Sequence, residues 1–441
     1  MQNSLEDIEK RGLRPESDFL YNRPIGVTMG RYHWQYFCKP EWMDGHILGF
    51  GKTGKQKTTS IGIPTGLSWR GTFFAPDMKG DIAKAVKPFR THLKVIDPCD
   101  EESFGFDPLW KLKFSDQPNN EIKKIGLRLI PETPNSENRF FVDSARNILM
   151  AVIQNYYDKG YSFIDMIDIL KKMKTHDLVV LLYEGGNIEV RSKLKELIDA
   201  ANSTFNSISQ ELSTYLTLYY DSEPIRSLYS RKNNFIPYEI ESWDGLFVIP
   251  PEELDNWRPV INYVLTDIFD YLFTRPDGIT DPILLMLDEF ASLGYFPKML
   301  SYITTLRSKK VTIMPICQSP AQIDELYGEL VRRIFVDNAE VIWTLGSGDP
   351  DSAEYISRLM GRYDKVDLRQ SYRRDKLAES PETRISESEK KTMLTEVEDL
   401  MTMRDEVFVR SPTGFHRLTK TRYDHSAFKR HYRNGFSQYL S

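Results

Sequence analysis

The stretch Pro282-Ile283-Leu284-Leu285-Met286-Leu287-Asp288-Glu289-Phe290 decides the fold class of this chain. Its run of apolar residues, preceded by proline and followed by two carboxylates, predicts a strand buried on both faces, as in a parallel sheet. Such a strand ends at the carboxyl edge of the sheet, where open α/β folds bind ligands. An acid at this position can hold Mg²⁺ beside a phosphate group, and a following glutamate can polarise an attacking water. The alternative is a core strand whose acids merely face solvent.

A phosphate-binding loop is predicted directly after a short strand at residues 45–50. The motif places Gly, four residues, Gly, Lys and then Ser or Thr between a strand and a helix. Gly51, Lys57 and Thr58 occupy three of its fixed positions. Backbone N–H groups of such a loop, together with the helix that follows it, bind phosphate.

The remaining fixed position departs from the motif, because Gln56 stands where the second glycine is expected. That glycine lets the backbone approach the phosphates in a conformation that a side chain makes costly. Gly54 supplies another flexible point two residues earlier. Taken alone, the loop is either a phosphate loop or a Gly/Lys-rich surface turn. Paired with the Asp-Glu strand downstream, it is interpreted as a phosphate loop by descent.

Other buried strands alternate with helices, which predicts a mostly parallel α/β sheet with right-handed crossovers. The predicted strands lie near residues 71–77, 93–98, 245–250, 311–318, 340–346 and 408–410, with an edge hairpin within 21–44. Apolar residues at helical spacing between 136 and 204, with breaks at Lys159-Gly160 and Gly185-Gly186, predict an all-helical insert. The resulting division is a discontinuous nucleotide-binding domain at 1–135 and 205–441 and an all-α domain at 136–204.

Two charged segments are predicted to lie outside the core. Residues 364–390 carry dense mixed charge with serine and proline, which is typical of a mobile loop. Residues 416–433 interleave basic and aromatic side chains, which fits either a surface for nucleic acid or an acidic partner, or a solvated tail.

The composition is that of a globular protein: 40% of the 441 residues are hydrophobic and 27% are charged. The net charge of -5 does not indicate a nucleic-acid partner, which would need a local basic surface. The three cysteines have no CxxC spacing, so neither a zinc site nor a disulfide framework is expected. With no signal peptide and no apolar run of about 18 residues, we expect a soluble protein unless a partner anchors it.

These stretches together resemble the TraG/TraD-type coupling proteins of type IV secretion and conjugation, within the RecA-like and FtsK-like hexameric ATPases. The resemblance extends over residues 20–425. Its most specific motif is Asp288-Glu289-Phe290-Ala291-Ser292-Leu293-Gly294. The other motifs that carry it are Gly51–Thr58, Ile63-Pro64, Asp77–Asp81, Phe106–Leu109, Gln318-Ser319, Ala353–Gly361 and Met393-Leu394-Thr395.

The resemblance implies ATP and Mg²⁺ as cofactors and a RecA-like P-loop domain with an inserted helical domain. Gly51, Gly54 and Thr59 would belong to the nucleotide-binding loop. In the same family pattern Lys57 would hold the β- and γ-phosphates, and Thr58 and Asp288 would hold Mg²⁺.

Three further residues receive catalytic roles by resemblance. Glu289 would orient or deprotonate the attacking water, and Gln318 would sense the γ-phosphate. Arg307 would act as an arginine finger in the neighbouring subunit, which requires a homo-oligomer such as a hexamer. Each of the last two residues also has a purely structural interpretation. Arg307 could be an exposed arginine at a helix end, and Gln318 could satisfy the hydrogen bond of a buried backbone group.

The function implied is to bring a DNA–relaxase complex, single-stranded DNA or a protein substrate to a secretion channel and to move it with ATP hydrolysis. Family members usually begin with transmembrane helices and carry glycine at the position of Gln56. The expected location is therefore cytoplasmic, recruited to the inner face of the cell membrane by a membrane-anchor partner. The alternatives are a non-hydrolysing adaptor with a decayed phosphate loop, and a DNA helicase or packaging motor unconnected with secretion.

Overall fold

The computed structural model describes residues 17–132, 138–373 and 382–433. The described residues form two units. The first holds the residues up to 93, residues 240–246 and those from 268 onward. The second holds residues 94–239 and 247–267.

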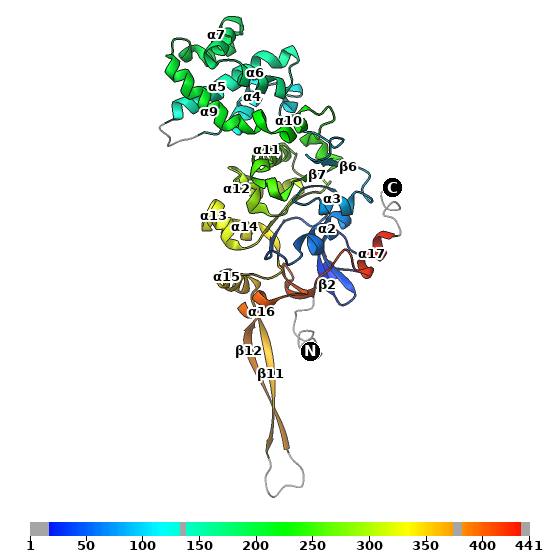
Figure 1. Cartoon of the computed structure of the whole chain (residues 1–441). Helices are drawn as coiled ribbons and strands as arrows, with labels where there is room; N and C mark the ends of the chain where they lie inside the picture. Colours follow the sequence, from blue (N-terminus) through cyan, green and yellow to red (C-terminus); the bar gives the residue numbers. More distant parts are fainter. Residues whose placement is uncertain (1–16, 133–137, 374–381, 434–441) are drawn as a thin grey trace. The chain divides into compact units, whose positions relative to one another are not determined.

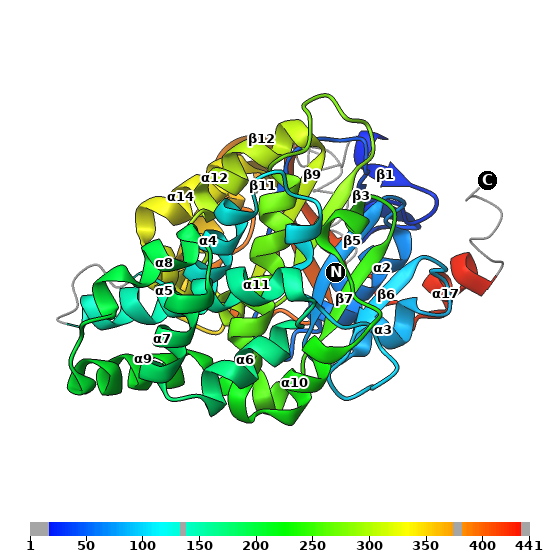
Figure 2. The same ribbon diagram turned by 90° about the horizontal axis from the view of Figure 1, so that it is seen from above.

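One sheet of twelve strands organises the chain, in the order β1-β3-β2-β14-β13-β10-β4-β9-β8-β5-β7-β6 (Figures 1 and 2). Its strands are β1 Leu20–Tyr21, β2 Val27–Tyr32, β3 Gln35–Lys39, β4 His46–Phe50, β5 Thr72–Asp77, β6 Leu93–Ile96, β7 Asp244–Val248, β8 Ile283–Leu287, β9 Val311–Cys317, β10 Ala339–Thr344, β13 Glu406–Ser411 and β14 Gly414–Thr419.

The central strands are parallel, as the apolar run before Asp288 predicts. Every residue of β8 is buried, and β8 pairs in parallel with β5 and with β9. Next to β9, β4 pairs in parallel with β9 and with β10. Parallel strands have helices on both faces, which explains why these strands are apolar without alternation. The predicted α/β fold with a parallel sheet is confirmed.

The other half of the sheet is antiparallel and includes a segment for which the sequence prediction was wrong. The predicted edge hairpin is present as β2 and β3, which pair in antiparallel fashion. Residues 416–419, however, belong to β14, which lies between β2 and β13 and not in a solvated tail. His416 and Lys420 are buried. The density of charge in this segment hides the alternation of β14, whose buried Leu418 is flanked by two exposed residues.

Helices cover both faces of the sheet in the first unit. In Figures 1 and 2, α2 and α3 lie on one side of the central strands, and α12 and α14 lie on the other side. The helices of this unit are α2 Ile63–Ser68, α3 Asp81–Val86, α12 Met299–Thr305, α13 Pro320–Tyr327, α14 Glu329–Asn338, α15 Pro350–Met360, α16 Val397–Thr402 and α17 Ser426–Arg433.

The second unit is mainly helical. Its helices are α4 Pro118–Leu129, α5 Arg139–Tyr156, α6 Phe163–Lys172, α7 Thr175–Gly185, α8 Ile188–Leu194, α9 Asn202–Asp221 and α10 Glu223–Ser230, together with most of α11 Leu254–Leu272. The helices therefore continue on both sides of the predicted segment at 136–204. A capping box of Ser162 and Asp165 starts α6, and Gly160 before it has a φ of 82°.

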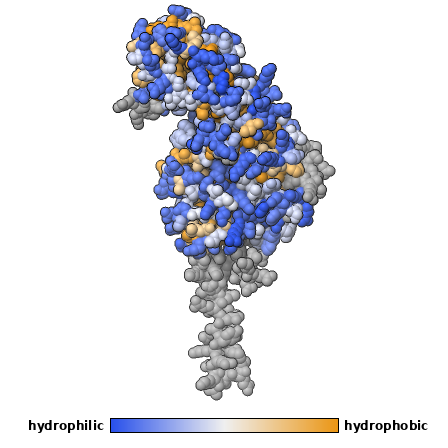
Figure 3. Space-filling view, in the orientation of Figure 1, coloured by the Kyte–Doolittle hydropathy of each residue, from blue (hydrophilic) through white to orange (hydrophobic). Residues whose placement is uncertain are grey.

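The surface of the helical unit combines charged and apolar side chains. Figure 3 shows apolar residues among hydrophilic ones over the helices around α7. Phe140, Leu181 and Ile188 are the large apolar side chains most exposed in this region. Within the described ranges, no helix combines the length and the apolar character needed to cross a bilayer.

The predicted mobile loop at 364–390 is wrong for most of its length. Residues Arg362–Arg373 form β11 and Glu382–Met393 form β12, and the two strands pair along their whole length in an antiparallel hairpin (Figure 1). The part of the predicted loop at 374–381 lies outside the described residues. Charge density was the basis of the loop prediction, but a two-stranded hairpin needs no buried face to satisfy its backbone hydrogen bonds.

Buried His46 at the start of β4 makes the stability of the protein depend on pH. Its Nε2 donates to the carbonyl of Ile303 at 2.8 Å, and its Nδ1 accepts from the N–H of Ile313 at 3.1 Å. The second bond requires the neutral ring, because a protonated Nδ1 cannot accept a hydrogen bond. Burial, aided by Lys39 and Arg307, lowers the pKa of His46 from 6.5 to about 4.

We therefore expect acidification to destabilise the wild type more than His46→Gln. Between pH 6.5 and 4 the unfolded histidine binds a proton that the folded one does not, so up to about 3 kcal/mol of stability is lost. Asp77, whose pKa burial raises to about 6, acts in the opposite direction in both proteins. Urea midpoints at pH 7 and pH 4.5 measure the difference. An equal pH dependence in the two proteins would contradict the assignment of a neutral His46.

Candidate nucleotide-binding site

The predicted phosphate loop connects β4 to a π-helical turn, η2 Thr58–Gly62, which continues into α2. Two backbone hydrogen bonds attach the loop to the carboxyl ends of the neighbouring strands. The N–H of Gly51 donates to the carbonyl of Cys317, the last residue of β9, at 3.0 Å, and that of Lys52 donates to the carbonyl of Gly346, after β10, at 3.3 Å. A Cβ at Gly51 would lie 3.1 Å from the Lys57 side chain, so glycine leaves room for that lysine.

Gln56 takes the backbone conformation that the missing glycine would take. Its φ is 64°, in the left-handed region, and the φ of Gly54 is 79°. The next residue, Lys57, is already helical, with a φ of -50°. The Gln56 side chain is exposed. The loop therefore keeps a left-handed turn before the helix despite the substitution, at a conformational cost of about 1 kcal/mol.

We expect Gln56→Gly to raise the free energy of unfolding by about 1 kcal/mol, because glycine adopts this φ without strain. Chemical denaturation monitored by circular dichroism measures the effect. Thr53→Gly is the matched control: Thr53 is exposed in the same loop and is not among the residues with positive φ. That control should be destabilising, because it adds only chain entropy. Destabilisation by both variants would rule out strain at Gln56.

The residues predicted from distant parts of the sequence converge at the carboxyl edge of the sheet. Lys57 Nζ lies 2.8 Å from Glu289 Oε1 and donates to the Gly51 carbonyl at 3.0 Å. Thr58 Oγ1 donates to Asp288 Oδ2 at 2.9 Å. Gln318 Nε2 donates to Glu289 Oε2 at 3.1 Å. The three segments after β4, β8 and β9 thus form one hydrogen-bonded network.

Glu289 is held in a strained turn. Its φ is 51°, and its backbone N–H donates to Asp288 Oδ1 at 3.1 Å. A non-glycine residue in this region is uncommon and clusters at functional sites. The turn aims the two adjacent carboxylates at different partners, Asp288 toward Thr58 and Glu289 toward Lys57 and Gln318.

The site concentrates negative charge in a buried place. Burial and the neighbouring Glu289 raise the pKa of Asp288, while Lys57 and the Thr58 hydroxyl oppose the rise. At the end of β5, burial raises the pKa of Asp77 to about 6, and Asp288 contributes to this rise. A divalent cation would relieve this repulsion, and the carboxylate and hydroxyl oxygens of Asp288 and Thr58 are the hard ligands that Mg²⁺ prefers. The donor set therefore fits the predicted metal.

Three of the predicted site residues lie outside this network: Gly54, in the left-handed turn of the loop, Thr59 and Arg307. The Thr59 hydroxyl donates to the Gln56 carbonyl at 3.2 Å, which closes the turn of the loop. Arg307 lies in η9 Leu306–Lys309, before β9, where it is 53% exposed and 3.5 Å from Glu340. Because β9 has seven residues, Arg307 and Gln318 are separated by about 23 Å of strand. Arg307 therefore lies at the opposite end of β9 from the network and does not take part in it.

Sequence reasoning missed a strap of C-terminal residues over the loop. Lys420 is buried and donates to the carbonyls of Lys55, at 3.3 Å, and of Arg404. The Lys55 ammonium donates to the Met403 carbonyl. The N–H of Tyr423 donates to the Thr59 carbonyl at 3.3 Å. No motif signals the contacts between this strap and the loop, because they join residues more than 340 positions apart.

The similarity of the chain to known proteins agrees with this geometry. The family model described as "Type IV secretory system Conjugative DNA transfer" matches residues 1–420. Protein VirD4 of Rhizobium rhizogenes is 22% identical over 78% of this chain and 54% of its own length. A probable conjugal transfer protein TraG of Sinorhizobium fredii is 23% identical over 72% of this chain and 52% of its own length. The chain thus spans about half the length of these curated relatives.

Solved structures of the plasmid coupling protein TrwB share the fold. TrwB in complex with a non-hydrolysable ATP analogue has a TM-score of 0.67 at 15% identity, over 95% of this chain and 94% of that chain. TrwB in complex with ADP and Mg²⁺ has a TM-score of 0.64 at 15% identity, over 87% of both chains. These similarities confirm the predicted RecA-like fold. Since the family model covers almost the whole sequence, this chain belongs to the type IV secretory system conjugative DNA transfer family.

Proposed function

We propose that this protein is the coupling ATPase of a conjugative type IV secretion system. The observation that carries the proposal is the convergence of Lys57, Thr58, Asp288, Glu289 and Gln318 in one hydrogen-bonded network. A chain that had lost catalysis would be expected to lose several of these side chains, whereas only the glycine at position 56 is replaced. The left-handed φ of Gln56 supports a preserved loop.

In this proposal the protein catalyses the reaction mainly by positioning the reactants and stabilising the charge of the γ-phosphoryl group, because phosphoryl transfer requires little covalent chemistry from the protein. Lys57 and the N–H groups of the loop would bind the phosphates. Thr58 and Asp288 would hold Mg²⁺, which would supply positive charge to offset that of the phosphates.

In this scheme, binding of the nucleotide frees the Glu289 carboxylate from its contact with Lys57. In the structure Glu289 is engaged by Lys57 and Gln318. When Lys57 turns from Glu289 toward the phosphates, one oxygen of the carboxylate becomes available to orient a water and accept its proton. Gln318 remains within reach of the other oxygen and links this change to β9.

The proposed substrate is single-stranded DNA, a relaxase–DNA complex or a protein, delivered to a type IV secretion channel. Contact with DNA is expected to be mainly to phosphates and strongly dependent on salt. We further propose that the active form is a homo-oligomer, a hexamer as in the RecA-like motors. A membrane-anchor partner would hold it at the inner face of the membrane, with the helical segment at 136–204 as the docking domain.

ATP turnover with and without single-stranded DNA tests the proposal, in the wild type, Gln56→Gly and Glu289→Gln. Turnover in the wild type that is lost in Glu289→Gln supports the motor. An inactive wild type that gains turnover in Gln56→Gly would instead support a non-hydrolysing adaptor, the second candidate, which the replacement at Gln56 favours. A helicase or packaging motor unconnected with secretion would bind neither a relaxase nor a channel component.

A further inference from the structure

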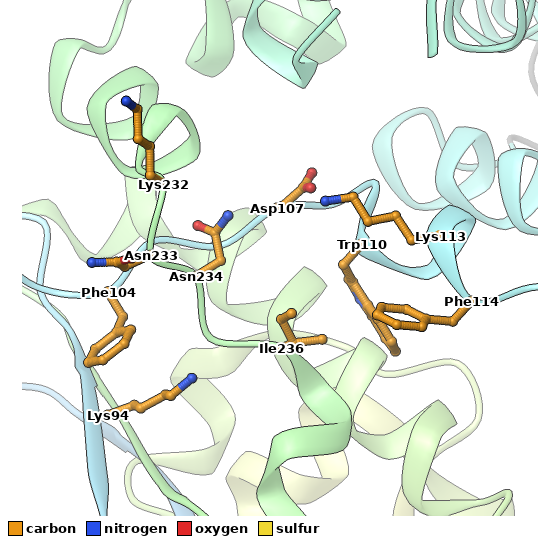
Figure 4. Close-up of a pocket in the computed structure, with 10 residues that line it drawn as sticks. All are labelled: Lys94, Phe104, Asp107, Trp110, Lys113, Phe114, Lys232, Asn233, Asn234 and Ile236. Atoms are coloured by element: carbon orange, nitrogen blue, oxygen red, sulfur yellow. The ribbon is translucent and has the colours of Figure 1, made fainter. Parts of the chain in front are cut away.

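A pocket of about 310 Å³ lies in the second unit and has no role in the scheme above. It is formed by Lys94 of β6, the segment at 104–107, the turn η3 Trp110–Lys113 with Phe114, and the segment at 232–236. Figure 4 shows Trp110 and Phe114 together on one side, and Lys94 and Phe104 on the other. Its volume is at the lower end of the range for small-molecule sites.

One wall of the pocket is an exposed aromatic cluster. The ring of Phe114 lies 6.3 Å from that of Trp110 and 5.4 Å from that of Tyr238. Trp110 is fixed below the surface by its indole N–H, which donates to Asp267 at 3.1 Å. Phe114, by contrast, is 59% exposed. A rigid ring presented in this way is a platform on which another flat ring can stack.

The charge of the lining is positive. Among the described residues, Lys113 and Lys232 form no ion pair, and both are exposed. Lys94 is buried, 2.6 Å from Glu239, and lies 4.9 Å above the ring of Phe104. The single carboxylate that lines the pocket is Asp107, and burial raises the pKa of Asp107. Figure 4 shows the two exposed lysines on opposite sides of Asp107, so two positive charges face one carboxylate and an anion would be attracted to this rim of the pocket.

The floor of the pocket is already ordered without a ligand, because hydrogen bonds join Gly105 to the segment at 233–235. The N–H of Gly105 donates to the Asn233 carbonyl at 2.8 Å, and that of Phe235 donates to the Gly105 carbonyl at 2.9 Å. A Cβ at Gly105 would lie 2.4 Å from the Leu228 carbonyl, so only glycine allows this approach. The contact holds the side-chain amides of Asn233 and Asn234 at the pocket. A preformed site loses less entropy on binding.

We propose that this pocket binds one nucleotide unit, with its base stacked on Phe114, its phosphate at Lys113 and Lys232, and its polar edge at Asn233 and Asn234. Aromatic stacking combined with lysines at the backbone is how single strands are bound without sequence preference. The unit belongs to a single-stranded nucleic acid or to a free mononucleotide. The first source rests on the proposed function as a DNA-coupling protein, and the second does not.

Fluorescence anisotropy of the full chain with labelled oligo-dT of about 12 nucleotides, without ATP, tests the proposal. Phe114→Ala should weaken binding by about 10-fold or more, and Phe114→Trp should restore it, because stacking needs only an aromatic face. Lys113→Ala and Lys232→Ala should each reduce the slope of log Kd against log salt by about 0.7. Phe140→Ala and Lys123→Ala, both exposed on helices of the same unit, are the matched controls and should change neither quantity.

Competition by dTMP distinguishes the two sources. Displacement of the oligonucleotide by dTMP, lost in Phe114→Ala, indicates a free mononucleotide; oligonucleotide binding that dTMP does not displace indicates a strand. Pocket variants that bind both probes like the wild type would overturn the proposal and leave the ATPase assignment untouched. So would a wild type that binds neither probe, or an acidic peptide whose binding needs the lysines but not Phe114.

Discussion

Glu289→Gln is expected to lower ATP turnover by about 10²-fold or more while leaving nucleotide affinity close to that of the wild type. In the proposed mechanism the substitution removes the group that accepts a proton from the attacking water, and general-base catalysis contributes about 10²–10⁴-fold. The amide keeps the shape of the side chain and a hydrogen-bonding oxygen for Gln318, which now lies 3.1 Å from the carboxylate.

Nucleotide affinity should not fall, for a reason visible in the contacts of Lys57. Its ammonium lies 2.8 Å from the Glu289 carboxylate, so that carboxylate competes with the phosphates for the same charge. The neutral amide competes less, and binding of a fluorescent ATP analogue should be equal to or tighter than that of the wild type. A variant with unchanged turnover, or with binding lost in proportion to turnover, would contradict the role of Glu289.

Glu354→Gln is the matched control for this experiment. Glu354 lies on α15, is 61% exposed and faces Arg358 at 3.6 Å. An exposed pair of this kind contributes about 1 kcal/mol or less to stability, so neither turnover nor binding should change.

Arg307→Ala is expected to lower turnover by about 10³-fold in the assembled protein, the lower end of the effect of an arginine finger. Arg307 lies before the amino end of β9, whereas Gln318 follows its carboxyl end, so the proposed finger role requires that its guanidinium act at the site of a neighbouring subunit. Its ion pair with Glu340, at 3.5 Å, is exposed and adds little to folding. Nucleotide affinity and the thermal midpoint should therefore stay near wild type.

Mixing subunits separates this role from a structural one. Arg307→Ala and Glu289→Gln should each be inactive alone, yet mixed assemblies should regain turnover. In such assemblies the intact Glu289 of one subunit meets the intact Arg307 of its neighbour. Arg333→Ala is the control, since Arg333 is 67% exposed and paired with Glu329 at 2.7 Å. No regain on mixing would exclude a finger supplied in trans.

The sequence by itself determined the class of fold and identified most of the residues that take part in the site network. The apolar run before Asp288 predicted a doubly buried strand, because it is short, follows a proline, ends in two acids and shows no alternation. The spacing of Gly51, Lys57 and Thr58 placed the loop at the end of β4. Such elements can be predicted from the sequence because the residues that define them are close together in the chain.

Only the tertiary structure decided which distant groups meet. Lys57 and Glu289, and likewise Lys55 and Lys420, come together because parallel strands bring segments hundreds of residues apart to one edge of the sheet. Charge density also led to two wrong predictions, a solvated tail and a mobile loop. The structure instead places β14 inside the sheet and pairs β11 with β12, although both segments are rich in charged residues. Those strands form through backbone hydrogen bonds, which do not depend on the charge of the side chains.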